Sequence, residues 1–74
     1  MITVYTKANC QPCNAVKRWL DKTGLEYTVL DAASYAGRLE AWGARSAPVT
    51  VIGDRVIMGF DPDKLHQAVV ETAL

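Results

Sequence analysis

The residues of this 74-residue sequence best able to do chemistry are its two cysteines, Cys10 and Cys13, which enclose Gln11 and Pro12. Three residues advance a helix by about 300° and ~4.5 Å, so on a helix the two side chains lie one turn apart on nearly the same face. Their Cα atoms should then fall within the ~4.4–6.8 Å that a disulfide requires. The spacing therefore predicts a redox pair in which Cys10 attacks and Cys13 resolves.

The segments on either side place this motif between a strand and a helix. Residues 2–6 are rich in β-branched and aromatic side chains, which indicates a strand, and residues 14–22 have helical periodicity. Cys10 is therefore expected near a helix N-terminus, where unpaired N–H groups favour an anion and lower a cysteine pKa from ~8.5 to roughly 3.5–7.5. Pro12 suits the first helical turn. Lys7 either adds a cation that supports the thiolate or is simply solvated.

The rest of the chain alternates apolar runs with segments of helical periodicity. Further strands are expected at 26–30, 47–52 and 55–58, and further helices at 34–42 and from 61–62 onward. Gly53 and Asp54 indicate a hairpin turn, while Asp61 and Pro62 have the form of an N-cap and a first helical residue. The order βαβαββα predicts an α/β fold with a four-stranded mixed sheet flanked by helices.

Apolar residues at helical spacing predict which helix faces are buried. The residues expected on these buried faces are Cys13, Val16, Trp19 and Leu20 in the first helix; Tyr35, Leu39 and Trp42 in the second; and Leu65, Ala68, Val69 and either Thr72 or Ala73 in the last. The two tryptophans are thus expected to pack rather than to recognise a partner. Asp31, at the end of the second strand, is expected to be solvated or to act as a capping residue.

Size and composition limit the function. The length fits one domain spanning residues 1–74, which we expect to be monomeric. Eight basic and eight acidic residues give a formal charge of zero, which argues against a nucleic acid or an anionic membrane as partner. The N-terminal stretch lacks the features of a signal peptide, so we expect a cytoplasmic protein. In that reducing compartment a Cys-x-x-Cys pair is more often catalytic or metal-binding than structural.

A metal-binding or metal-delivery module is the alternative from a different functional class. A structural zinc site needs four ligands, and only His66, expected on the surface of the last helix, remains beyond the two thiols. Copper-chaperone-like domains carry a methionine two residues before the first cysteine, where this chain has Ala8. Asn14 after the second cysteine excludes the haem-attachment motif. No metal site is therefore expected.

Two further motifs give the chain a family resemblance. Pro48, within Ala47-Pro48-Val49, precedes a strand, which by itself indicates a sheet edge, a bulge or a cis bond. The second motif is Gly59-Phe60-Asp61-Pro62-Asp63. Together with Cys10-Gln11-Pro12-Cys13, these motifs resemble the glutaredoxin-like branch of the thioredoxin superfamily, and more narrowly the NrdH-type redoxins, over essentially the whole chain.

The resemblance implies a minimal thioredoxin fold in which Pro48 is a cis-proline beside the disulfide. It implies reduction of protein disulfides without a bound cofactor. Electrons would come from NADPH through a flavin-containing thioredoxin reductase and pass to a class Ib ribonucleotide reductase or another disulfide-containing protein. The backbone of Ala47 is expected to pair with an extended segment of the substrate.

Two residues in the matching motifs depart from the usual patterns. Glutaredoxins recycled by glutathione usually carry a second glycine after the one matching Gly59, and here Phe60 stands there. Its bulky ring argues against tight glutathione binding. The ring either offers an apolar patch to a protein partner or packs as a hydrophobic staple before the cap of the last helix. A glutathione-dependent glutaredoxin is the alternative function. The order Gln11-Pro12 places proline before the second cysteine, as in thioredoxins. We therefore expect a redox potential of roughly −200 to −270 mV.

Overall fold

The computed structural model describes residues 1–73, with Ala73 described by its backbone alone. Its elements are β1 (Ile2–Thr6), α1 (Gln11–Thr23), β2 (Thr28–Asp31), a 3₁₀ helix η1 (Ala32–Tyr35), α2 (Ala36–Ala41), β3 (Val49–Ile52), β4 (Arg55–Met58) and α3 (Pro62–Ala73). This confirms the order βαβαββα, with a short 3₁₀ helix added before α2. Within residues 1–73, no helix is long and apolar enough to cross a membrane.

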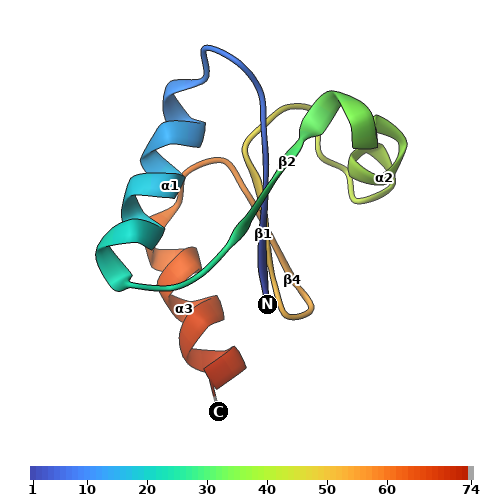
Figure 1. Ribbon diagram of the computed structural model, residues 1–74. Helices are drawn as coiled ribbons and strands as arrows, with labels where there is room; N and C mark the ends of the chain where they lie inside the picture. Colours follow the sequence, from blue (N-terminus) through green and yellow to red (C-terminus); the bar gives the residue numbers. More distant parts are fainter. Residues whose placement is uncertain (74) are drawn as a thin grey trace.

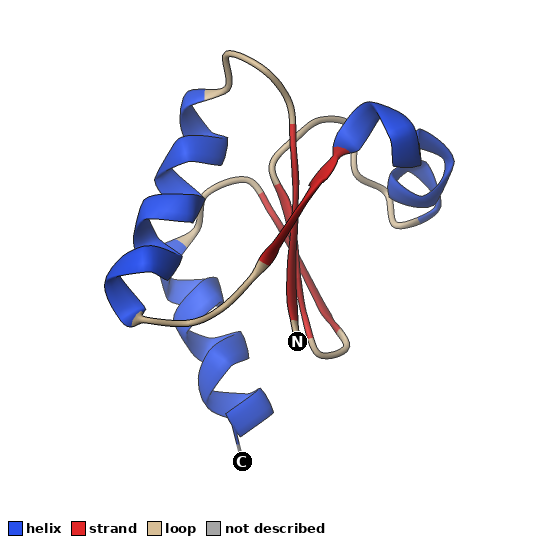
Figure 2. Ribbon diagram, in the orientation of Figure 1, coloured by secondary structure: helices blue, strands red, loops and turns tan. Residues whose placement is uncertain are grey.

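The four strands form one mixed sheet in the order β2-β1-β3-β4. β1 and β2 are parallel, while the β1–β3 and β3–β4 pairs are antiparallel. Helices α1 and α3 cover one face of this sheet, and η1 with α2 covers the other (Figures 1 and 2). The fold is therefore the helix-flanked, four-stranded mixed sheet that the sequence pattern predicted, and it matches the minimal thioredoxin fold that the resemblance implied.

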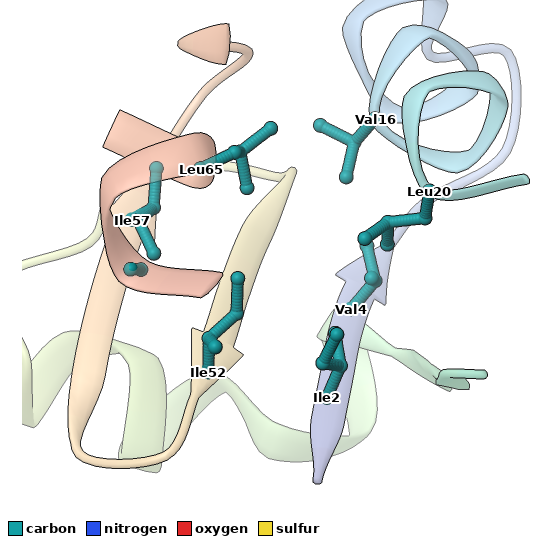
Figure 3. Close-up of a cluster of buried hydrophobic side chains, with 8 residues drawn as sticks. Ile2, Val4, Val16, Leu20, Ile52, Ile57 and Leu65 are labelled. Atoms are coloured by element: carbon teal, nitrogen blue, oxygen red, sulfur yellow. The ribbon is translucent and has the colours of Figure 1, made fainter. Parts of the chain in front are cut away.

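The larger core lies between the sheet and the α1–α3 layer. Its buried members are Ile2, Val4, Val16, Leu20, Ile52, Ile57, Leu65 and Ala68 (Figure 3). Strand residues alternate between the two faces of a sheet, which is why Val4 enters this core and its neighbour Tyr5 does not. Each buried aliphatic side chain contributes about 1.5–3 kcal/mol, so this core is the main source of stability in so small a protein.

The smaller core lies under η1 and α2, around the ring of Tyr5. This ring meets Tyr35 and Trp42 edge to face, with centroids 5.5 and 5.9 Å apart. Arg38 Nη1 donates a hydrogen bond of 3.1 Å to the Tyr5 hydroxyl. Leu39 is buried here, and Tyr35 and Trp42 are partly buried, as their helical spacing predicted. Trp42 thus packs here, and Trp19 packs against the larger core in the same way.

Two element boundaries differ from the predictions near β2. The strand begins at Thr28 rather than at residue 26. The Tyr27 hydroxyl donates to Asp21 Oδ1 over 2.9 Å, which ties this segment to the end of α1. Burial and this hydrogen bond raise the pKa of Tyr27. Asp31 ends the strand and caps η1, since its side chain accepts a hydrogen bond from the Ala33 N–H. Because this 3₁₀ helix occupies residues 32–35, the α-helix predicted at 34–42 is shortened to α2.

The first helix and the third strand also start elsewhere than predicted. α1 begins at Gln11, three residues before the predicted periodic segment at 14–22, because Cys10 itself serves as the N-cap. Pro12 stands in the first turn, as predicted. β3 begins at Val49 instead of residue 47, since Pro48 has no N–H to donate to a neighbouring strand. Gly24 ends α1 in a left-handed conformation with φ of 76°, as predicted.

The C-terminal half follows its prediction closely. β4 spans residues 55–58, and Asp61 precedes α3 with its Oδ1 accepting the Lys64 N–H over 3.2 Å. Leu65 and Ala68 are buried and Val69 is partly buried. Thr72 is exposed, so the prediction that it could extend the buried face is wrong, and the side chain of Ala73 lies outside the described part.

Asp61 provides a test of this capping arrangement. Replacing it with alanine (D61A) removes the acceptor for the Lys64 N–H and should lower the free energy of unfolding by about 1 kcal/mol. The matched control D61N keeps a capping oxygen and should lose clearly less. Chemical denaturation of both variants measures the difference, and equal losses would contradict the assigned cap.

Candidate active site

The two cysteines lie at the end of the sheet where three connecting segments meet. Tyr5 of β1 pairs with Val49 of β3, which in turn pairs with Met58 of β4. The end of β1, the start of β3 and the end of β4 are therefore side by side. The segments that leave the sheet here are residues 7–10, 47–48 and 59–60. Strand register thus brings together motifs that are far apart in the sequence.

The loop after β1 turns the chain into α1. Asn9 adopts a left-handed conformation with φ of 55°, which asparagine accepts more readily than most residues. Cys10 follows with an extended backbone as the N-cap, and its carbonyl accepts the Asn14 N–H over 3.2 Å. The whole Cys-Gln-Pro-Cys unit therefore forms the cap and first turn of α1.

The sulfur atoms of Cys10 and Cys13 form a disulfide, with Cα atoms 5.2 Å apart as the spacing predicted. The backbone N–H of Cys13 donates to Cys10 Sγ over 3.2 Å. Cys10 Sγ therefore takes the place that a serine or aspartate oxygen holds in an ordinary N-cap. The same donor and the positive end of the helix would stabilise a thiolate at Cys10 after reduction.

The two cysteines differ in accessibility. Cys10 is 6% exposed and Cys13 is 1% exposed. A substrate disulfide approaching from solvent can therefore reach the sulfur of Cys10 first, while Cys13 lies behind it on the buried face of α1. The geometry favours Cys10 as the attacking sulfur and Cys13 as the resolving sulfur. Gln11 and Pro12, both exposed, border the site.

The Ala47–Pro48 peptide bond is cis, as the resemblance implied. The Ala47 carbonyl oxygen lies 4.0 Å from Cys10 Sγ, and Pro48 is buried. The Pro48 carbonyl accepts the Gly59 N–H over 2.9 Å, which fixes the segment after β4 against it. Because β3 is an inner strand, the sheet-edge interpretation of this proline is wrong.

Phe60 presents its ring at the surface beside the first helix. It is 42% exposed, and a shallow groove of about 230 Å³ lies between it and α1. Trp19, Arg18 and Lys22 line this groove. Met58, next to Gly59, is exposed as well. An apolar surface flanked by cations therefore lies between α1 and the segment that follows β4.

Lys7 is exposed and lines a different groove, of about 630 Å³, together with Ala47. The remaining lining comes from η1, α2 and the segment before β3, including Arg45 and Ser46. Arg45 was not singled out from the sequence, because only its position two residues before Ala47 connects it with the site. The structure thus places Lys7 and Arg45 along a groove that leads to the Ala47 backbone.

Metal-ligating side chains are scattered over the part of the chain that is described. Within it, no three His, Cys, Asp or Glu side chains come together in a way that could hold a metal ion. His66 is exposed on α3. The two thiols would therefore be the only nearby ligands for a metal, and a closed structural site needs four.

Comparison with known proteins gives consistent results at the sequence level. The Glutaredoxin family model matches residues 2–57. The glutaredoxin-like protein NrdH of Salmonella typhimurium is 36% identical over 69 residues, covering 89% of this chain and 85% of the relative. The Gene 56 protein of Mycobacterium phage D29 is 34% identical over 73 residues, covering 92% and 81% of the two chains.

Solved structures show the same relationship. The NrdH-redoxin of Escherichia coli superposes with a TM-score of 0.83 at 33% identity, covering 89% of this chain and 91% of that one. A buckwheat glutaredoxin in complex with glutathione superposes with a TM-score of 0.77 at 26% identity, covering 97% and 78%. Both the sequence and the backbone are therefore similar to those of small redox proteins with a thioredoxin-like fold.

Alkylation of the reduced protein tests the difference between the two cysteines. The capping N–H and the helix end act on Cys10, so a thiolate fraction of about half, against a few per cent for an ordinary cysteine, predicts roughly tenfold faster iodoacetamide labelling at Cys10 than at Cys13. Mass spectrometry of timed samples measures both rates, and the variants C10S and C13S assign them. Equal rates, or faster labelling of Cys13, would contradict this geometry.

Proposed function

This chain belongs to the glutaredoxin family of thiol-disulfide oxidoreductases, and we propose that it passes electrons from thioredoxin reductase to protein disulfides. The observation that carries the finer proposal is Phe60, which fills the place of a glycine that glutathione-dependent members usually have and exposes 42% of its surface. The relatives named NrdH, at 33–36% identity, support the same assignment. The E. coli NrdH-redoxin is itself described as having a thioredoxin-like activity profile.

We assign the catalytic roles to Cys10 and Cys13. The Cys10 thiolate attacks one sulfur of the substrate disulfide, and the other substrate sulfur leaves as a thiolate. Cys13, as a thiolate, then attacks Cys10 Sγ and displaces the second substrate sulfur. Two electrons reach the substrate, and the protein is left with the disulfide seen here.

Residues around the pair would hold the substrate during this exchange. An extended substrate segment can pair with the backbone N–H and C=O of Ala47, because that carbonyl lies 4.0 Å from Cys10 Sγ. Pro48 and Gly59 fix this backbone, while Gln11 and Pro12 tune the thiolate from the first turn of α1. Lys7 lines the groove leading to the same backbone and would steer a partner.

The donor and the acceptor follow from the family resemblance. NADPH would be used only indirectly, through the flavin of thioredoxin reductase, so the chain itself needs no bound cofactor. A class Ib ribonucleotide reductase is the expected acceptor, with other protein disulfides as alternatives. We place this exchange in the cytoplasm, where such a reductase keeps dithiols reduced, and expect residues 1–74 to act as one monomeric domain.

A specific observation favours a second candidate, a glutathione-dependent glutaredoxin. The groove beside Ala47 is lined by two cations, Lys7 and Arg45, which could pair with the carboxylates of the tripeptide. The buckwheat relative was solved with glutathione bound. The choice between the donors therefore depends on whether Phe60 excludes the tripeptide.

A coupled assay of NADPH consumption decides between the donors. With a protein disulfide as acceptor, the wild-type protein should turn over with thioredoxin reductase and only weakly with glutathione and glutathione reductase. Phe60→Gly should raise the glutathione-dependent rate by about tenfold, because it restores close approach to the backbone. Phe60→Leu keeps an apolar side chain and serves as the control. Wild-type turnover with glutathione alone would overturn the proposal.

A further inference from the structure

Thr50 of β3 is a buried polar residue whose position calls for a physical explanation. Among the residues whose side chains are described, it is the only buried polar or charged one, with 0% of its surface exposed. Its Oγ1 has no hydrogen-bond partner among them. A buried hydroxyl without a partner is unfavourable, and valine would fill the same space without that cost. Such a group in a core is rare enough to suggest a role.

The strand register fixes the side of the sheet to which Thr50 points. Its neighbour Val49 belongs to the smaller core, so Thr50 faces the opposite side. Thr50 pairs with Val4 on β1 and with Ile57 on β4. Both of these residues belong to the larger core, under α1 and α3 (Figure 3). The hydroxyl of Thr50 is therefore enclosed in that core.

Within this core Thr50 lies toward the end next to the disulfide. It follows Pro48 by two residues, and Pro48 adjoins the carbonyl that is 4.0 Å from Cys10 Sγ. On α1, Cys13 lies one turn before Val16, which points into the core above the sheet (Figure 3). Thr50 is thus the first residue of β3 on this face of the sheet, and Cys13 is the buried residue of α1 one turn before Val16, so both lie at the disulfide end of the layer between the sheet and α1.

We propose that the Thr50 hydroxyl forms a hydrogen bond with the sulfur of Cys13 when the disulfide is reduced. This inference rests on the proposed function, in which the pair alternates between disulfide and dithiol. In the disulfide the Cys13 sulfur is bonded to Cys10 and is only a weak acceptor. In the dithiol the Cys13 thiol can donate to Oγ1, and as a thiolate it can accept the Thr50 O–H.

This hydrogen bond would serve the step that releases the substrate. The Cys13 thiol first gives its proton to water, and its thiolate then attacks Cys10 Sγ. The bond between Cys10 and the substrate sulfur breaks, and the substrate leaves as a thiolate that takes a proton from water. Cys13 is 1% exposed, so its thiolate has little hydration. A donor from Thr50 replaces part of that hydration.

The same bond would shift the redox equilibrium of the pair. The hydroxyl is unpaired in the disulfide form and paired in the dithiol form, so it favours the dithiol. A redoxin whose dithiol is stabilised is a stronger oxidant. Thr50 therefore limits how strongly reducing the protein is. This effect depends on the core position alone and not on which electron donor reduces the disulfide.

Equilibration with reduced and oxidised dithiothreitol tests the inference. Thr50→Val should shift the equilibrium constant about tenfold toward the disulfide, which corresponds to about 30 mV. Thr50→Ser keeps the hydroxyl and should stay within about twofold of the wild type. A T50V equilibrium constant within about twofold of the wild type would overturn the inference. No reductase takes part, so this result stands whether or not the donor assay supports the proposed function.

Two further measurements separate the hydrogen bond from a general effect on packing. Denaturation of T50V should show a disulfide form at least as stable as the wild type and a dithiol form that is less stable; equal changes in both would contradict the bond. If T50V does not fold, the infrared S–H band of Cys13 in the variant C10S gives the answer. A band shifted to lower frequency from that of a free thiol supports the bond, and an unshifted band overturns it.

Discussion

In the mechanism that we propose, the chemistry of this protein depends on the hydrogen bond from the Cys13 N–H to Cys10 Sγ. This hydrogen bond exists because β1 ends at Thr6, the loop turns through Asn9, and α1 begins directly after Cys10. Each of these features is needed to point the first backbone donors of the helix at a sulfur. A thiolate there is stabilised by backbone groups that are fixed in place, without a charged side chain having to be held nearby.

The sheet supplies the second half of the site. β1 and β3 are its inner strands, and their antiparallel pairing brings the cysteine loop next to the Ala47–Pro48 peptide. β4 then places Gly59 and Phe60 at the same end. A small protein can bury only a thin core, and here two clusters, one on each face, hold these strands in register. The rigidity of the site therefore comes from the packing of the sheet between its helices.

Much of the fold and of the candidate site was predictable from local sequence, and the features that were not depend on contacts between residues distant in the sequence. The redox pair, the hairpin at Gly53 and the capped start of α3 are each set by a few adjacent residues, and the structure has them where they were predicted. Cys10 was predicted near the N-terminus of α1, but its role as the N-cap was not, because a cysteine is an unusual N-cap. Arg45 and Thr50 were missed because a groove and a buried, unpaired hydroxyl arise only when the strands and helices pack together.

Trapping the mixed disulfide tests most directly whether Cys10 is the attacking sulfur and Cys13 the resolving sulfur. The variant C13S, incubated with a disulfide-containing protein substrate, should accumulate a covalent adduct through Cys10 that dithiothreitol releases. The variant C10S should form far less of it, because Cys13 is buried and lacks the capping donor. Adduct formation by C10S and not by C13S, or by neither variant with any disulfide substrate, would contradict the account.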